Sequence, residues 1–216
     1  MNRFYVRFAI AWLVSVGLGC TSAQVRYYTL TPPPDKTLPA SETTVAIDVR
    51  VVHTPPQLNR SELMVRTGPT ELTLLENERW ASPVNDEIKE ALRFELQRRL
   101  DRTSGLRPAF TKLTIDIDVQ QLEAKLGRYA LLEASWSASS SAAGQRSNAA
   151  PPTTCTFQAD EKIQAGYAEM VEGYQRAIEA LADAIEAVLT SPAGGIDAAC
   201  QKSMEGSAGG SGSKDH

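Results

Sequence analysis

Alternating hydrophobic and polar residues mark the predicted strands of this chain. Hydrophobic side chains fall at every second position over residues 45–52 and again over residues 113–119. Successive side chains of a strand point to opposite faces, so both segments are predicted to be strands with one buried face. Shorter or less regular patterns predict further strands over residues 26–30, 62–66, 71–75, 128–136 and 153–163.

Glycine and proline indicate how these strands are connected. Gly68-Pro69 lies between two short predicted strands and is typical of a hairpin turn. The run Lys125-Leu126-Gly127 joins the strand over residues 113–119 to the one over residues 128–136 as a second hairpin. Residues 137–152 are rich in Ser, Ala and Pro, and we expect them to form a long mobile loop.

Two segments have the three-four spacing of apolar residues that is typical of amphipathic helices. The first begins at Ser82-Pro83, an N-cap followed by proline at the first helical position, and ends before Gly105. Asp86 and Glu87 fall in its first turn, where acidic groups favour the helix dipole. The second covers residues 167–189. The pattern therefore predicts an α+β fold, a two-layer domain whose mixed β-sheet carries two long amphipathic helices packed on one face.

The two ends of the chain differ from this middle part. Residues 1–19 contain Arg3 and Arg7 and then an apolar run, the layout of a signal peptide. That run is too short to remain as a membrane-spanning helix. We expect residues 20–44 to form a lipidated N-terminus, a short strand and a Pro-rich tether, and residues 45–192 to form the α+β domain. Residues 193–216 are predicted to be a flexible Gly/Ser-rich tail.

The end of the signal peptide indicates an acylation site. Residues 16–20 resemble the bacterial lipobox, whose cysteine is lipidated and becomes the mature N-terminus, here Cys20. Gly17 stands where a large aliphatic residue is usual, and the alternative is ordinary secretion with cleavage near Ala23. Acyl chains on Cys20 would anchor the protein to a membrane. By similarity to enterobacterial sorting, Thr21 indicates the outer membrane.

Composition narrows the classes of function. The 22 Lys and Arg against 26 Asp and Glu give a net charge of -4 with no basic block, so nucleic acid is not an expected partner. The histidines are His53 and His216, too few for a His-rich metal site. Nucleotide-binding, metal-binding and nucleophile-elbow motifs do not occur. We therefore expect no enzyme activity, metal or cofactor, with a hydrolase that uses His53 as the alternative.

The other two cysteines form an even pair. Since the signal peptide directs the chain to an oxidising periplasm, Cys155 and Cys200 are predicted to form a disulfide. The alternative is a reduced pair, with Cys155 buried in the domain and Cys200 in the tail.

Several motifs together resemble one family. Tyr27-Tyr28-Thr29-Leu30 follows soon after Cys20, and Arg79-Trp80-Ala81-Ser82-Pro83 leads into the first predicted helix. Residues 55–60 and 64–67 and the start of the second helix fit as well. In these features the chain is similar to the ABC-type transport auxiliary lipoproteins of the PqiC type. The resemblance covers most of the mature chain.

The resemblance implies a non-enzymatic periplasmic lipoprotein, anchored at the outer membrane, that works with an MCE-domain protein in an ABC-driven lipid transport system. It also implies assembly into a homo-oligomeric ring. Tyr27, Tyr28 and Trp80 are candidate anchors of a partner interface because aromatic residues are enriched at binding hot spots. Each could equally belong to the core.

A second function of another class is a stand-alone envelope lipoprotein that binds a lipid or an envelope fragment. Such a protein would need an apolar hollow between its helices and its sheet. A docking subunit needs a solid core and an interface instead.

Overall fold

The computed structural model describes residues 24–33, 46–58, 60–102, 112–141 and 154–190, together with Cys200. The predicted signal peptide, Cys20, most of the Pro-rich tether and all of the predicted tail except Cys200 lie outside these residues.

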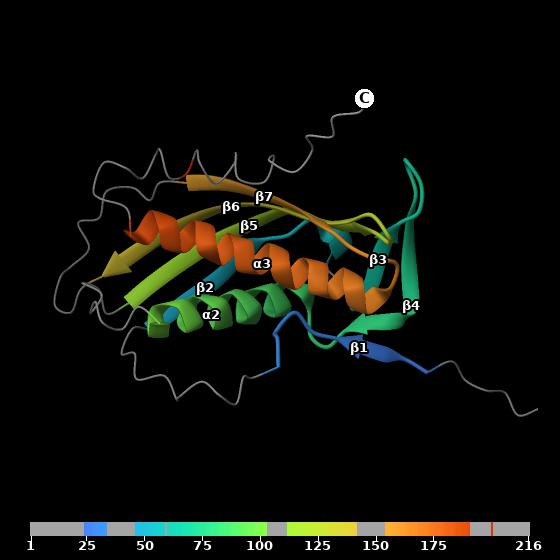
Figure 1. Ribbon diagram of the computed structural model, residues 1–216, viewed down its shortest axis with the longest axis horizontal. Coiled ribbons are helices and arrows are strands. Elements are labelled where there is room, and N and C mark those ends of the chain that lie inside the picture. Colours follow the sequence, from blue (N-terminus) through green and yellow to red (C-terminus); the bar gives the residue numbers. More distant parts are fainter. Residues whose placement is uncertain are drawn as a thin grey trace, which may run out of the picture.

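Within the described residues, the strands form two mixed sheets (Figure 1). The larger has the order β2-β5-β6-β7, in which β2 is parallel to β5 and the other neighbours are antiparallel. The smaller has the order β1-β4-β3, with β1 parallel and β3 antiparallel to β4. The strand bounds are β1 Arg26–Tyr28, β2 Ala46–His53, β3 Glu62–Arg66, β4 Leu72–Trp80, β5 Lys112–Lys125, β6 Tyr129–Ser141 and β7 Thr154–Lys162.

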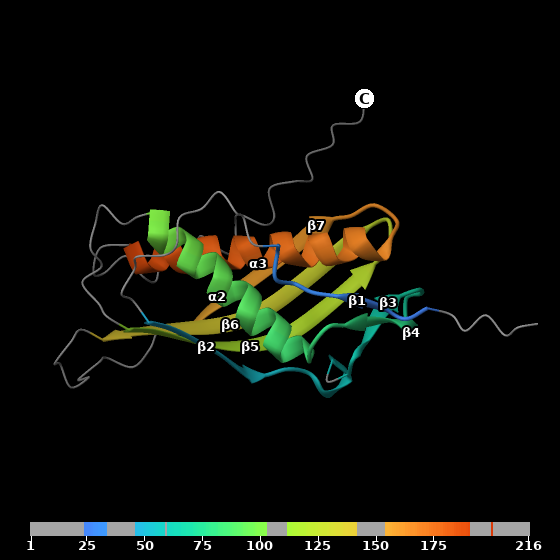
Figure 2. The same ribbon diagram turned by 90° about the horizontal axis from the view of Figure 1, so that it is seen from below.

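Two long helices, α2 (Val84–Arg102) and α3 (Tyr167–Thr190), cover the same face of the four-stranded sheet (Figures 1 and 2). A short 3-10 helix, η1 (Pro56–Leu58), follows β2. The predicted α+β fold with both helices on one face is confirmed. The structure adds that the strands divide into two sheets, where a single mixed sheet was expected.

The core lies between the helices and the four-stranded sheet. On β5 the inward side chains Leu113, Ile115, Ile117 and Val119 are fully buried. The apolar residues of α3, which have the predicted three-four spacing, belong to the same core as these β5 side chains. Among them, Ile178, Leu181 and Ile185 are almost inaccessible to solvent. Burial of these apolar surfaces is the main favourable contribution to folding. The apolar side chains that follow the three-four spacing of α3 and the alternation of β5 thus pack in one core.

Two strands are longer than their local patterns predict. β4 continues beyond Leu75 to Trp80, because residues 78–80 pair in parallel with β1. β6 continues through Ser141 into the segment expected to be a loop, because Ser137–Ser141 pair with β5. Serine and alanine are weak strand formers, so here the ladder with a neighbouring strand outweighs local propensity. The rest of that predicted loop lies outside the described residues.

The hairpin between β5 and β6 turns where it was predicted. Gly127 has a φ of 72°, a left-handed conformation that favours glycine. The N–H of Arg128 donates to the carbonyl of Lys125 at 2.9 Å and closes the turn. The predicted hairpin is therefore formed.

Candidate functional site

The N-terminal strand is fastened to the domain by a buried carboxylate. Glu78 of β4 accepts hydrogen bonds from Arg26 Nε at 3.0 Å and from the Tyr28 hydroxyl at 2.8 Å. The hydrogen bond from Arg26 holds the pKa of Glu78 below its usual range, although burial alone would raise it. Arg26 and Tyr28 thus point toward β4, on the same side of β1.

A second buried carboxylate continues this attachment. Glu87, in the first turns of α2 and only 4% exposed, accepts hydrogen bonds from Thr29 Oγ1 at 2.7 Å and from the N–H of Leu30 at 2.8 Å. Its other oxygen accepts from the N–H and the hydroxyl of Ser82 at 3.0 and 2.7 Å. Glu87 therefore joins the segment after β1 to the start of α2. Leu30 beside it is 1% exposed, so this segment is part of the packed domain.

The aromatic residues proposed as interface anchors occupy different environments. Tyr27 is 66% exposed, because strand alternation points it away from Arg26 and Tyr28. Trp80 is 7% exposed, and its ring centroid lies 6.2 Å from that of Tyr174 in α3. At these positions Trp80 and the half-buried Tyr28 stabilise the fold. Of the three, Tyr27 is the one whose side chain is mostly available to a partner.

The two helices are joined through Arg99, whose side chain is 3% exposed. Its guanidinium donates to the side chain of Glu95 on α2 at 2.6 Å. It also donates to Asp183 Oδ1 at 2.8 Å and to the carbonyl of Glu179 at 2.9 Å, both on α3. A planar guanidinium can hold several acceptors in fixed directions. Arg99 therefore fixes α3 against α2 over their C-terminal halves.

Among the described residues, the inward side chains of α2, α3 and the four-stranded sheet form one buried cluster. Beneath Trp80 and Tyr174 lies a cavity of about 20 Å³, whose other lining residues include Leu63, Leu122 and Met170. That volume suits about one water molecule. Burial raises the pKa of the Tyr174 hydroxyl far above its usual range, so this phenol stays neutral.

A larger hollow lies on the outside, between α2, α3 and the segment after β1. This groove of about 480 Å³ has an apolar floor that includes Leu30, Phe94 and Ile178. Five charged side chains also line it, Glu95, Arg98, Glu172, Arg176 and Glu179. Because acyl chains bind in apolar enclosures and charged walls are costly to desolvate, this open groove is poorly suited to a lipid tail.

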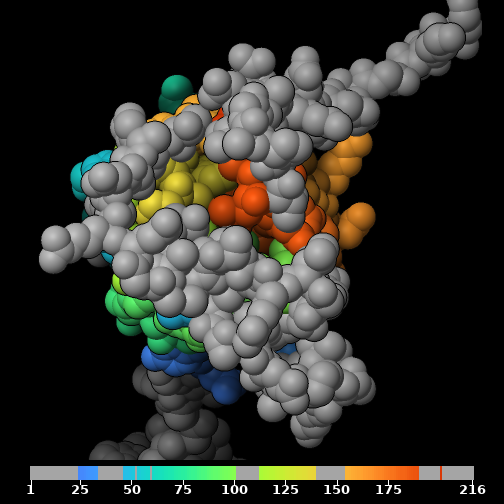
Figure 3. All heavy atoms as spheres, turned by 90° about the vertical axis from the view of Figure 1, so that its left-hand side faces the viewer, coloured from blue at the N-terminus to red at the C-terminus, as the bar shows by residue number. Residues whose placement is uncertain are grey.

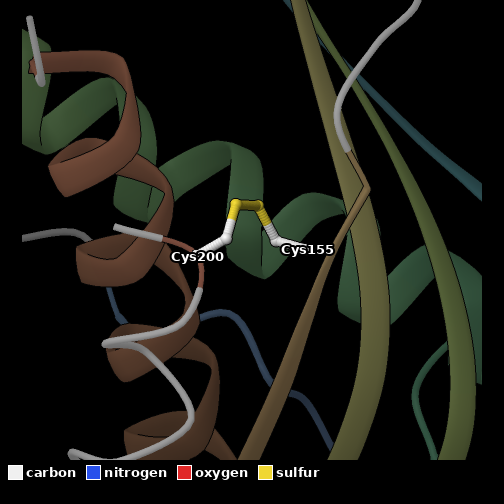
Figure 4. The surroundings of a disulfide bond; sticks show 2 residues. All are labelled: Cys155 and Cys200. Atoms are coloured by element: carbon white, nitrogen blue, oxygen red, sulfur yellow. A yellow bond between two sulfur atoms is a disulfide. The ribbon is translucent and has the colours of Figure 1, made fainter. Parts of the chain in front are cut away.

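The structure brings the two remaining cysteines together. Cys155 of β7 and Cys200 form a disulfide with their Cα atoms 5.2 Å apart, in the space between α3 and the sheet (Figure 4). Both residues are buried. The segment after α3 is thereby linked covalently to β7.

Among the described residues, the strand partners of His53 do not form a hydrolytic triad. The strand register pairs His53 with Asp118, and Asp118 with Ser135. The carboxylate thus stands between the imidazole and the hydroxyl, whereas a triad needs the imidazole in the middle. Asp116, on the same face of β5, accepts a hydrogen bond from Arg50 at 2.8 Å. Within the described residues no group of three or more His, Cys, Asp or Glu side chains could hold a metal ion.

A family model for the ABC-type transport auxiliary lipoprotein component matches residues 28–186, from β1 into α3. The chain belongs to this family. An auxiliary lipoprotein is a transport component and not an enzyme class, and it is a protein of the cell envelope. No helix among the described residues is long and apolar enough to cross a membrane.

Solved structures show the same fold for this auxiliary lipoprotein. An uncharacterised protein of known crystal structure is 19% identical, with a TM-score of 0.56, covering 76% of this chain and 97% of its own. Protein XCC0632 from Xanthomonas campestris is 17% identical, with a TM-score of 0.52, covering 83% of this chain and 99% of its own. No curated protein sequence matches the chain.

The carboxylates Glu78 and Glu87 hold the N-terminal segment in place, and the sequence pattern does not indicate this role. The sequence predicts Glu87 only as a partner of the helix dipole, and the strand pattern over residues 71–75 ends before Glu78. A capping box places the acidic residue three positions after the N-cap, whereas Glu87 follows Ser82 by five, so this pattern does not identify Glu87. No local signal points to Thr29 or Leu30 as its other partners, because they are more than 50 residues away in sequence.

Proposed function

We propose that this auxiliary lipoprotein is a non-enzymatic periplasmic subunit of an MCE/ABC-type lipid transport system. It is anchored through acylated Cys20 and docks the transporter at the outer membrane, with several copies forming a ring. The observation that carries this proposal is the packing of the described core, in which the inward side chains of β5 and α3 are buried against one another. This packing favours a docking subunit over a carrier, which would need an apolar hollow between its helices and its sheet.

Other features of the domain support the same role. The described residues contain no triad geometry around His53 and no metal cluster. Arg99 joins the helices, and Glu78 and Glu87 fasten the N-terminal strand. A rigid body with a single N-terminal anchor suits a part that positions other proteins.

The test is a pull-down of the acylated protein from solubilised envelopes, with mass spectrometry of partners, bound lipid and the modification on Cys20. We expect recovery of an MCE-domain protein with its permease and ATPase, and less of them with Cys20→Ala. His53→Ala is the matched control and should recover the same partners as the unsubstituted protein. Recovery of the protein alone with stoichiometric lipid would make it a carrier. Loss of function in cells that carry a stably folded His53→Ala would favour the hydrolase.

A further inference from the structure

The exposed large hydrophobic side chains of this protein gather on one sheet. Among the described residues they are Val25, Tyr27, Leu72 and Leu74. Val25 directly precedes β1, Tyr27 lies in β1, and Leu72 and Leu74 lie in β4 of the same three-stranded sheet. This sheet forms the right-hand end of the molecule in Figures 1 and 2. We call these four residues the apolar patch.

The patch is not required by the packing of the domain. Tyr27 is turned outward while its neighbours Arg26 and Tyr28 reach Glu78. In β4, Leu72 and Leu74 alternate with Thr73 and Leu75, which are less exposed. The register places Tyr27 beside Arg79 and Leu74 beside Met64, so the two pairs lie along different parts of β4 and together lengthen the exposed apolar surface of this sheet. Exposed apolar surface of this kind can mark an interaction site.

The charges around the patch are neutralised by one another. Arg26 pairs with Glu78, Arg79 with Glu62, and Arg66 with Glu123. Glu71 and Glu76 are exposed beside Leu72 and Leu74, and the whole chain carries a net charge of -4. An anionic surface would therefore not attract this end of the molecule. A neutral or zwitterionic surface fits it better.

The length of chain before β1 brings this end close to the anchor. Three residues separate Cys20 from Gln24, and Val25 follows directly, so the five residue steps from Cys20 to Val25 span at most about 17 Å when fully extended. An acylated Cys20 sits at the membrane surface. Val25 and Tyr27 are thus held near that surface whichever path the intervening residues take.

We propose that the apolar patch rests on the membrane that holds Cys20, with Tyr27, Val25, Leu72 and Leu74 in contact with zwitterionic phospholipid. Tyrosine is enriched at membrane interfaces because its ring is apolar and its hydroxyl remains hydrated. The patch then orients the domain, with the three-stranded sheet toward the lipid and the opposite end toward the periplasm. This inference rests on the acylation of Cys20 in the proposed function.

The opposite end supplies the control position. Figure 3 views that end, where atoms of β6 in yellow lie beside atoms of α3 in orange-red. Ser139 is exposed and lies two residues before the end of β6. A tryptophan at Ser139 should therefore remain far from a membrane that touches β1.

The experiment uses the acylated mature protein in vesicles of phosphatidylethanolamine and phosphatidylcholine whose acyl chains are brominated, which quench nearby tryptophan. Tyr27→Trp, Leu72→Trp and Ser139→Trp are compared with the unsubstituted protein, whose Trp80 and Trp136 are buried. We expect quenching at positions 27 and 72 to exceed that at 139 by about two-fold or more, since only interfacial side chains approach the bromine atoms. Val25→Trp replaces Tyr27→Trp if that variant does not fold.

The other outcomes overturn the inference in distinguishable ways. Equal quenching at all three positions, or quenching at position 27 without position 72, shows that the patch does not rest on lipid. Unquenched tryptophans that shift to the blue when a protein partner is added assign the patch to that partner. An unmodified Cys20 in the mass spectrum overturns this inference together with the proposed anchoring, whereas an acylated Cys20 without quenching overturns this inference alone.

Discussion

Glu123 of β5 is the residue at which the two sheets meet through charge. Arg66 of β3 donates to both of its carboxylate oxygens at 2.5 Å, and the Tyr129 hydroxyl donates to it at 2.7 Å. The hydrogen bonds from Arg66 hold the pKa of Glu123 below its usual range. A carboxyl whose pKa is lower in the folded state stabilises that state above its unfolded pKa of about 4.3, and this contribution is lost as the pH falls through the folded value.

Glu123→Gln should therefore lower the free energy of unfolding at pH 7 by about 1–2 kcal/mol, since charged hydrogen bonds are replaced by neutral ones. The difference from the unsubstituted protein should shrink as the pH falls below about 4.3, where Glu123 becomes protonated in the unfolded chain and then in the folded one. Urea unfolding at several pH values measures both effects. Glu90→Gln, in an exposed pair with Arg93, is the control and should change stability little. A loss that is constant from pH 7 to pH 3 would contradict this assignment.

At the scale of elements, the packing of α3 on the sheet depends on one missing side chain. A Cβ atom at Gly173 would lie 2.5 Å from Ile163 Cγ2 and 2.9 Å from the Cβ of Ala130 in β6. Both distances are shorter than van der Waals contact. Glycine is disfavoured inside a helix, so its presence here reflects the close approach of α3 to β6 and to the residue after β7.

The substitution Gly173→Ala separates helix propensity from packing. Propensity alone would stabilise the protein by about 1 kcal/mol, whereas overpacking destabilises by about 1–3 kcal/mol. We expect the packing effect to dominate and the free energy of unfolding to fall in denaturant titrations. Glu172→Ala, at the exposed neighbouring position, should stay within about 0.5 kcal/mol of the unsubstituted protein. A Gly173→Ala protein that is more stable would show that α3 can move away from the sheet.

At the scale of the whole molecule, the Cys155–Cys200 disulfide connects the chain beyond α3 to the domain. The disulfide spans 45 positions in sequence and links the segment beyond α3 to β7, an edge strand of the four-stranded sheet. A crosslink of this length removes many conformations from the unfolded chain. Together with the attachment of β1 through Glu78 and Glu87, it ties both ends of the described fold to its core.

Removing this crosslink should lower the midpoint of thermal unfolding. The loop-closure estimate for a loop of this length gives up to about 4 kcal/mol. Scanning calorimetry of the oxidised protein, the reduced protein and Cys155→Ala/Cys200→Ala measures the effect. The reduced protein and the double variant should unfold at similar temperatures, and reductant should not change the variant further. An unchanged midpoint in both would show that the bond contributes nothing to stability.

Part of the candidate site could be predicted from residue types, and part could not. The motif around Trp80 identified the family, and Cys155 and Cys200 were paired by counting. Which aromatic residue is exposed was not predictable, since Tyr27 and Tyr28 are adjacent and chemically alike. Only the pairing of β1 with β4 decides that Tyr28 turns toward Glu78 and Tyr27 toward solvent.

The sequence by itself determined the elements that have a regular local pattern of hydrophobic, capping or turn residues. The repeat of α3, the alternation of β5 and the turn at Gly127 are local patterns, and the structure contains all three. The helix predicted to start at Ser82-Pro83 is also present, with α2 beginning at Val84 and the Ser82 hydroxyl donating to Glu87. The tertiary structure alone decided the division into two sheets, the extensions of β4 and β6, and the partners of Glu78 and Glu87. These features depend on strands and side chains that come together from distant parts of the chain. Packing and hydrogen bonding between such segments produce no periodic pattern in the sequence of either one, so the sequence does not predict them.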